Sequence, residues 1–391
     1  MKFIKVNDLQ PGMRLARPIY NKLGVMLYDR DTKLTSQGIL SIDNFGLIGL
    51  YILEPAEPAI PLTEEEIEFE KFQTTAVFKL KDDLVLLKNN KAPKNLISLS
   101  QTLLTRYGKL DHKIHFTQNV RSADDYVYKH CLSTAILVAM MVPKLKFGYE
   151  DQLATVCAAL IHNIGMLFIP PRIIEKGDNI SEAEKLQIKK ILEKGYALLH
   201  PESNDYDLPD ATLQIAGQMA RIEHSPDVPM DKTIRWHKGS TVLHVAAMYD
   251  TLTAMGLDHE PVSKLVALDF LRAHQVHYLP KIVNVLTQCI HVLPTGCCVD
   301  LSDGEQGIVI VDDSVNFATP VIIRFSDHKV YDLNDPLVAK NLHIKDIMQT
   351  MDVRVPVDEE TLKQFVPDEH TQKMTNSFME KRAKLIAAGR L

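Results

Sequence analysis

The 391-residue sequence predicts a multidomain α+β fold with a central all-α domain, a small N-terminal α/β module, and a small C-terminal β appendage with a helical tail. Three features support this prediction. Short β-like runs and turns fill residues 1–54, helical periodicity dominates residues 123–292, and β-rich runs return after Pro294. The chain is long enough for two or three domains with at least one sizeable core.

The N-terminal module is predicted over residues 1–54. Ser36 precedes a short helical stretch, and prolines close the module at its C-terminal end. An acidic run from Glu64 then begins a helix. We therefore predict a Pro/Glu-rich linker with connector helices over residues 55–120. The β-like runs of the module are Arg14–Tyr20, Val25–Tyr28 and Ile48–Leu53.

The central helical domain is predicted over residues 121–292. Val127–Val142 and Leu153–Met166 are hydrophobic almost all round, which is typical of helices buried at the centre of a domain. Ser181, with Glu184 three residues later, forms a capping box that begins another helix. Roughly seven helices are expected.

The chain after the helical domain predicts a β-hairpin appendage over residues 293–345. Asp303-Gly304 lies between β-rich runs and is a good hairpin signal, so three or four strands are expected. Residues 346–391 are polar and predict a helical tail, whose basic residues are interpreted as a solvated face.

The composition is that of an ordinary soluble globular protein, with 46% hydrophobic and 24% charged residues. A net charge of -6 gives no general attraction to nucleic acid or to anionic membranes, so neither is expected as a partner. The N-terminus lacks the apolar core of a signal peptide, and no apolar run reaches the roughly 18 residues that a membrane span needs. We therefore expect a cytoplasmic location.

The cysteines predict neither disulfides nor a structural zinc site. There are five, an odd number, in apolar surroundings and without CxxC spacing. Reduced, buried thiols are the favoured interpretation, and a redox role for the adjacent pair Cys297-Cys298 is the alternative. The cysteines are Cys131, Cys157, Cys289, Cys297 and Cys298.

The dipeptide His162-Asn163, inside the apolar run Val156–Ile169, is the most informative motif. It differs by one residue from a metal-dependent phosphohydrolase signature, in which adjacent His and Asp end a buried helix and bind metal. The amide of Asn163 offers an oxygen but no charge to offset a divalent cation. No GxSxG, P-loop or strand-bound GxGxxG motif is present.

Residues 123–292 resemble the HD-GYP family, bacterial phosphodiesterases that linearise cyclic di-GMP at a two- or three-metal site. The resemblance rests on the helix with His130, on LIHNIG, on IPPRIIEKGDNISEAE, and on VAAMYDTLTA. LARPIYNKLG and SDGEQGIVI also resemble the modules that flank such domains in Gram-positive bacteria. The resemblance implies an HD-type helical domain.

The same resemblance implies that most metal ligands are missing. His130 and His162 occupy two ligand positions, and Asn163 replaces the aspartate of the HD pair. Two imidazoles and an amide cannot hold two divalent ions that repel each other in a low-dielectric pocket. The remaining ligand positions fall on Ile191, Arg221-Ile222 and Ala247, although a small gap would bring His224 close to the second of these.

Groups that would hold substrate are reduced as well. Met166 replaces a lysine of the family motif, whereas Lys176 remains as a candidate phosphate contact. The arginine near the site, Arg221, would add positive charge. Asp250 matches the second aspartate of the family's VYDAL segment, and we expect it to brace a neighbouring helix.

The predicted function is a catalytically inactive HD-GYP-like protein, a scaffold or signalling module related to cyclic di-GMP that needs no cofactor. The expected partners are one or more proteins, cyclic di-GMP, and a second copy in a homodimer. The alternative is a phosphodiesterase or phosphohydrolase with residual activity, which would bind iron or manganese through His130, His162, Asn163 and His224.

Two further interpretations of the histidines stay open. His130 and His162 can be buried neutral histidines, each satisfied by a hydrogen bond. A replacement metal cluster could also form from histidines that are distant in sequence, although their spacing matches no ligand pattern. Its members would be His200, His224, His237 and His244.

Overall fold

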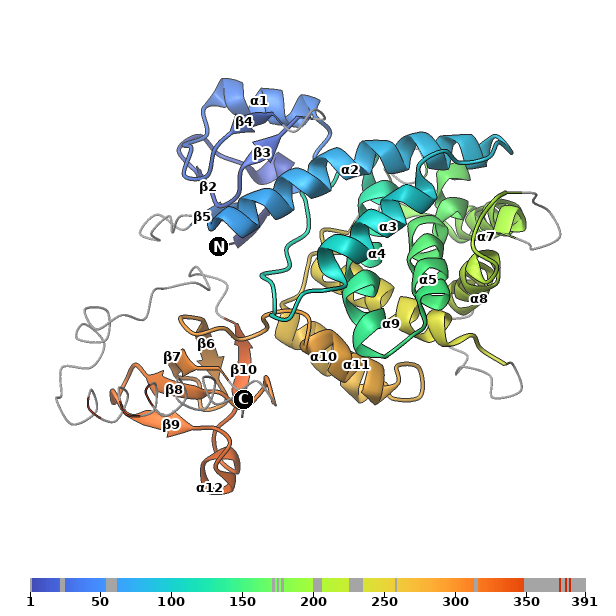
Figure 1. Ribbon diagram of the computed structural model, residues 1–391. Helices are drawn as coiled ribbons and strands as arrows, with labels where there is room; N and C mark the ends of the chain where they lie inside the picture. Colours follow the sequence, from blue (N-terminus) through green and yellow to red (C-terminus); the bar gives the residue numbers. More distant parts are fainter. Residues whose placement is uncertain are drawn as a thin grey trace.

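A computed structural model provides the coordinates. It describes residues 2–21, 25–53, 62–170, 173, 176, 179–199, 206–224, 235–256, 259–312 and 316–347, together with Lys373, Ser377 and Glu380. The predicted fold class is confirmed, since a bundle of helices is accompanied by a small N-terminal module and a C-terminal sheet, which both lie on the left of the bundle in Figure 1. The predicted helical tail lies almost entirely outside the described residues.

The N-terminal module has a core of its own, which includes Leu15, Ile42 and Leu50. Its three-stranded antiparallel sheet has the order β1-β5-β2, and α1 and a β3–β4 hairpin complete the module. Pro18, which has no N–H to donate, separates the single run predicted over Arg14–Tyr20 into two strands of different sheets. The elements are β1 (Lys2–Lys5), β2 (Arg14–Leu15), β3 (Ile19–Tyr20), β4 (Met26–Tyr28), α1 (Ser36–Asn44) and β5 (Gly49–Leu53).

Helices α2 (Glu64–Lys88) and α3 (Leu96–Tyr107) occupy the region predicted as a linker with connector helices. A capping box between Thr63 and Glu66 begins α2. Both helices pack on the central helices, and their apolar faces belong to the same core. Residues 62–107 are therefore part of the helical bundle.

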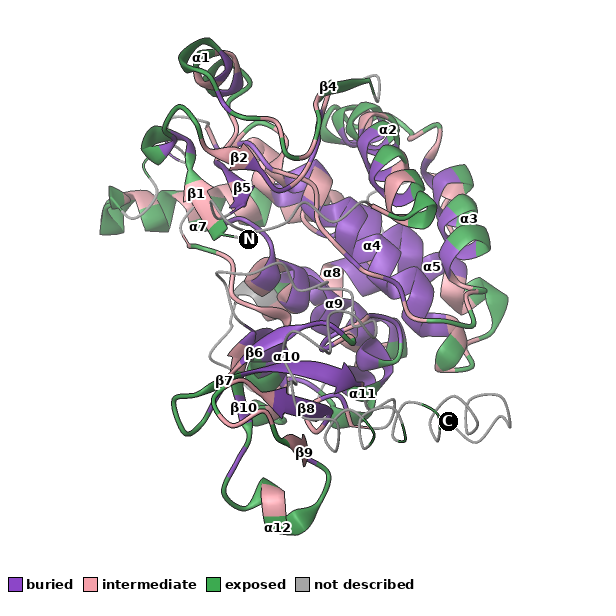
Figure 2. Ribbon diagram, turned by 90° about the vertical axis from the view of Figure 1, so that its left-hand side faces the viewer, coloured by how far each residue is buried: buried purple, intermediate pink, exposed green. Residues whose placement is uncertain are grey.

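The centre of the bundle is formed by α4 and α5, which are buried along almost their whole length (Figure 2). The other helices surround them, and the capping box predicted at Ser181 begins α7. Between residues 121 and 292, seven α-helices lie in the described residues, as expected. They are α4 (Tyr126–Lys144), α5 (Tyr149–Ile161), α7 (Glu182–Tyr196), α8 (Thr212–His224), α9 (Lys238–Thr253), α10 (Lys264–Ala273) and α11 (Pro280–Thr287).

Two segments, Tyr126–Lys144 and Tyr149–Phe168, have the length and mean hydropathy of membrane-spanning helices. The expectation that no apolar run is long enough was therefore wrong by this measure. Their most apolar windows are 83% and 67% buried inside the protein. Burial in the core accounts for their apolar character.

The C-terminal sheet has five antiparallel strands in the order β10-β6-β7-β8-β9, and not the three or four predicted. The predicted turn at Asp303-Gly304 joins β6 to β7, and Gly304 has the positive φ of 86° that favours glycine. Buried side chains of this sheet join the core of the bundle. The strands are β6 (Cys298–Leu301), β7 (Gln306–Val311), β8 (Val321–Arg324), β9 (Val330–Asp332) and β10 (Ile344–Ile347).

The segment Ile114–Ser122 connects the parts of the molecule. Ile114 pairs with Ile290, which follows α11, and Ser122 pairs with Leu47 of the N-terminal module. Between these ends, the backbone oxygen of Thr117 accepts a hydrogen bond from Gln73 of α2. We call this stretch the junction segment.

Candidate functional site

His130 and His162 meet at the centre of the bundle. His130 lies on α4, and His162 is the residue that ends α5. Their side chains are 3% and 0% exposed, and the two Nε2 atoms lie 3.3 Å apart. The packing of α4 on α5 therefore brings together the two histidines identified from the sequence.

The Nδ1 atoms of both rings have acceptors on the opposite side. His162 Nδ1 donates to the backbone oxygen of Ala159 at 2.8 Å, one turn earlier in α5. His130 Nδ1 lies 2.6 Å from Oδ2 of Asp250, a carboxylate of α9 that accepts this hydrogen bond. Because both Nδ1 atoms donate, the two Nε2 atoms are acceptors in neutral rings, and a hydrogen bond between them requires a second proton on one of the two rings.

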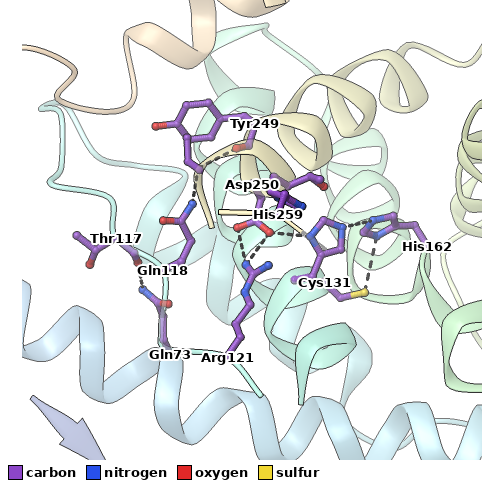
Figure 3. A network of polar contacts seen from close by, with 12 residues as sticks. Gln73, Thr117, Gln118, Arg121, Cys131, His162, Tyr249, Asp250 and His259 are labelled. Carbon is purple, nitrogen blue, oxygen red and sulfur yellow. Dashed lines mark hydrogen bonds and ion pairs between the residues drawn. The ribbon is translucent and has the colours of Figure 1, made fainter. Parts of the chain in front are cut away.

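Asp250 is bound from its other side by Arg121, the last residue but one of the junction segment. Arg121 Nη2 lies 2.8 Å from Oδ1 and 2.6 Å from Oδ2, and neither side chain is exposed (Figure 3). The carboxylate thus connects the junction segment to α4. This contact agrees with the expectation that Asp250 braces a neighbouring helix.

The charged groups in this network shift the pKa values of their neighbours. Burial alone would raise the pKa of Asp250, but Arg121 and His130 together lower it. Burial also opposes the charge of Arg121, and Asp250 outweighs it, so the pKa of Arg121 is raised. Burial, followed by the charge of His130, lowers the pKa of His162 to about 3. His162 is therefore neutral at neutral pH.

The side chain of Arg121 is held in place mainly by its ion pair with Asp250. Its Nε and Nη1 atoms are buried and have no hydrogen-bond partner in the described residues, whereas its guanidinium lies 5.1 Å from the ring centre of Tyr126. An unpaired buried donor costs about 1–3 kcal/mol. The ion pair with Asp250 is therefore the main reason that this side chain stays buried.

These side chains do not fit a two- or three-metal centre. The donors near the histidines are two imidazoles and the thiol of Cys131, whose Sγ lies 3.8 Å from His162 Nδ1, and the nearby carboxylate already binds a guanidinium. Among the described residues, no three His, Cys, Asp or Glu side chains form a group able to hold a metal ion. Asn163 follows His162 at the start of a 3-10 helix, η2 (Ile164–Phe168), and adds no charge.

The other ligand positions implied by the resemblance add no donors. Ala247 is buried, Ile191 is half-buried, and Arg221 is exposed on α8. Arg121, which binds Asp250, supplies positive charge beside the histidine pair.

The histidines of the replacement cluster divide into two groups. His200 and the side chain of His224 lie outside the described residues. His237 caps α9 and lies 3.6 Å from Asp151, whereas His244 packs against the ring of Tyr278. Each of these two has a structural role of its own.

Lys176, the candidate phosphate contact, is bound to Glu184 of the α7 capping box. The hydrogen bond from Lys176, with those from Ser181, lowers the pKa of Glu184 to about 2. A phosphate that bound Lys176 would have to compete with this carboxylate.

Comparison with known proteins identifies the central domain. The family described as "HD domain" matches residues 91–282. The cyclic di-GMP phosphodiesterase PA4108 of Pseudomonas aeruginosa is 19% identical over 214 residues, which are 53% of this chain and 49% of that protein. The chain is an HD-GYP-like protein. It spans about half the length of the curated relative that it matches.

A solved structure is also similar to this HD-GYP-like protein. It is Bd1817, a HDG"Y"P protein from Bdellovibrio bacteriovorus, with 14% sequence identity and a TM-score of 0.38. The match covers 73% of this chain and 97% of that chain.

No sequence pattern indicates the buried role of Arg121 in this HD-GYP-like protein. Arginine is almost never fully buried unless it is paired, and its partner lies 129 residues away. The HD match, which begins at residue 91, also includes α3. The helical domain therefore begins earlier than the predicted boundary at residue 121.

Proposed function

We propose that this protein is a catalytically inactive HD-GYP-like protein that acts as a scaffold or signalling module in cyclic di-GMP networks. One observation carries the proposal. The acidic side chain beside the histidine pair, Asp250, is bound to the buried guanidinium of Arg121. The negative charge that a divalent cation would need is already neutralised.

The hydrogen bonds of Asp250 add to this argument. Asp250 Oδ2 binds both Arg121 and His130, so two donors already share this oxygen. A divalent cation placed between the Nε2 atoms would face the arginine across a short, low-dielectric distance. Hydrolysis by a metal-bound hydroxide has no support from this donor set.

A role in protein contacts is supported by the surface of the N-terminal module. Apolar side chains of α1 and of the β3–β4 hairpin are exposed, and clusters of this kind commonly mark interaction sites. We propose that a protein partner, or a second copy of the chain, binds here in the cytoplasm. The exposed side chains are Val25, Met26, Leu27, Leu40 and Phe45.

The decisive experiment is metal analysis of protein purified with iron and manganese, combined with an assay of cyclic di-GMP hydrolysis. We expect substoichiometric metal and no turnover, and His162→Ala should change neither value. Exposed His274 provides the matched control, His274→Ala. Stoichiometric iron or manganese that His162→Ala removes and His274→Ala retains, together with turnover, would establish the phosphodiesterase alternative.

Calorimetry with cyclic di-GMP tests whether the protein binds this nucleotide. Binding without turnover that Lys176→Gln weakens would make the protein a receptor for this nucleotide. No heat of binding at high micromolar ligand would limit the role to protein contacts. Whichever result the calorimetry gives, the metal analysis tests the loss of catalysis separately.

A further inference from the structure

A cavity of about 260 Å³ lies where the N-terminal module, the bundle and the C-terminal sheet meet. The module contributes Phe3, Arg17 and Tyr51, and the junction segment contributes residues 115–118. Val262, just before α10, lines the cavity on the bundle side, and Ile347 of β10 lines it on the sheet side. The cavity is distinct from the histidine pair, because neither His130 nor His162 lines it. We call it the junction pocket.

Three acidic side chains line the junction pocket, those of Glu66, Glu70 and Glu260. Glu66 accepts hydrogen bonds from the backbone and hydroxyl of Thr63 in the capping box. Glu70 is hydrogen-bonded to Tyr20, and, after burial, its charge raises the pKa of Tyr20 to about 12. Glu260 is exposed at the edge. Glu66 is therefore bonded within the capping box, Glu70 is bonded to Tyr20, and Glu260 is solvated.

Arg17 is the basic group best placed to bind a ligand. Its Nη1 donates to the backbone oxygen of Gln118 at 2.9 Å, and its guanidinium lies 4.4 Å from the ring centre of Tyr51. Within the described part of the chain, no carboxylate forms an ion pair with it. A guanidinium has five N–H donors, so donors remain for a planar anion such as a carboxylate or phosphate.

The other side chains that line the pocket favour a ligand with a flat or apolar skeleton. Phe3, Tyr51 and Phe116 supply aromatic surface, and Val262 and Ile347 supply aliphatic surface. Lys2 and Lys264 add positive charge at the lining. The volume is slightly below the range of about 300–1,000 Å³ that is usual for drug-sized ligands, which favours a small metabolite.

We propose that the junction pocket binds a small metabolite that carries a carboxylate or phosphate group on an aromatic or apolar body. Arg17 binds the anionic group, and the aromatic side chains pack against the aromatic or apolar part of the metabolite. The proposal does not depend on whether the histidine pair is catalytically inactive.

Phenyl phosphate and benzoate are the probes, and benzyl alcohol is the neutral analogue. Calorimetry on the full-length protein should show binding of at least one anion at millimolar concentration, and the stronger of the two identifies the head group. Arg17→Gln should weaken this binding by about tenfold or more. Arg14→Gln is the matched control, because Arg14 lies in the same module but pairs with Asp31 and does not line the pocket.

A second variant keeps the test valid if Arg17→Gln does not fold. Val262→Trp fills the pocket from the bundle side and should abolish binding while Arg17 remains. Three results would overturn the proposal. They are no binding of either anion to the unmodified protein, binding of benzyl alcohol as tight as that of the anions, and binding that both variants retain.

Discussion

Arg121 and Asp250 form an ion pair from which water is excluded, with Arg121 Nη2 2.6 Å from Oδ2 of the carboxylate. The arginine belongs to the junction segment and the aspartate to α9, so the pair joins two parts of the chain that are 129 residues apart. Its position beside His130 makes it the feature on which the proposed loss of catalysis depends.

Removing one partner of this ion pair should destabilise the protein strongly. Arg121→Met leaves the Asp250 carboxylate buried without its main partner, which costs about 3–5 kcal/mol of unfolding free energy. The double variant Arg121→Met/Asp250→Asn should recover most of this loss. Urea unfolding measures each value.

The ion pair between Arg14 and Asp31 is the control for that measurement. It is partly exposed, so Arg14→Met should cost about 1 kcal/mol or less. If Arg121→Met costs no more than Arg14→Met, the buried pair does not have the role that we assign to it.

Stability should fall in mild acid, in part because of His244. Burial, followed by the charge of His277, lowers the pKa of His244 to about 4. The unfolded chain, with a pKa near 6.5, takes up a proton first. The contribution of His244 is therefore complete above pH ~6.5 and is lost toward pH ~4, by at most about 1.4 kcal/mol per pH unit.

Urea unfolding between about pH 7.5 and pH 5, a range that brackets the imidazole pKa, tests this prediction. His244→Phe should reduce the slope, whereas His274→Gln, a change at an exposed position, should not. Equal slopes for the unmodified protein and His244→Phe would show that His244 is not the group responsible.

Two glycines hold α7 close to the loop that follows the histidine pair. A Cβ on Gly195 would lie 2.5 Å from the Cα of Gly165 in η2, so Gly195→Ala forces the two elements apart. We expect a loss of about 1–3 kcal/mol in unfolding free energy. Gly217 of α8 meets only an ordinary contact at 3.6 Å, so Gly217→Ala should stabilise the helix by up to about 1 kcal/mol. Thermal or urea unfolding measures the change in unfolding free energy for each variant. A loss for Gly195→Ala with a gain for Gly217→Ala would confirm the close packing, and changes of the same sign would refute it.

The cysteines should be unreactive in the folded protein. All five are free and buried, and burial raises the pKa of Cys157 and of Cys289 to about 12. Ellman's reagent should label none of them at pH ~8 until urea unfolds the chain. Fast labelling of Cys297 or Cys298, or a disulfide between them after mild oxidation, would instead support the redox alternative.

Local patterns predicted much of the helical bundle. The apolar segments that became α4 and α5 are unambiguous because nearly every side chain is buried, and the capping box at Ser181 fixes the start of α7. The Asp303-Gly304 turn was equally clear, since it needs a residue with positive φ. These features depend on neighbours a few residues away.

Features that depend on distant partners were not predictable. Strand β1 is a short run near the N-terminus, and it is recognisable only through its pairing with β5. The helix that begins at the acidic run was predicted, but only as a connector, because its apolar face becomes evident only against α4. Of the site, the sequence predicted His130 and His162, but it gave no reason to place Arg121 between them and the N-terminal module.

The sharing of one core by α2, α3 and the central helices determines which fragments can be produced. A shortened protein that begins at residue 121 would lack Phe116 and both of these helices, and would leave the apolar surface of α4 and α5 in water. Such a truncation is expected to aggregate. Expression of the domain by itself should start ahead of Thr63, so that α2 keeps its first turn.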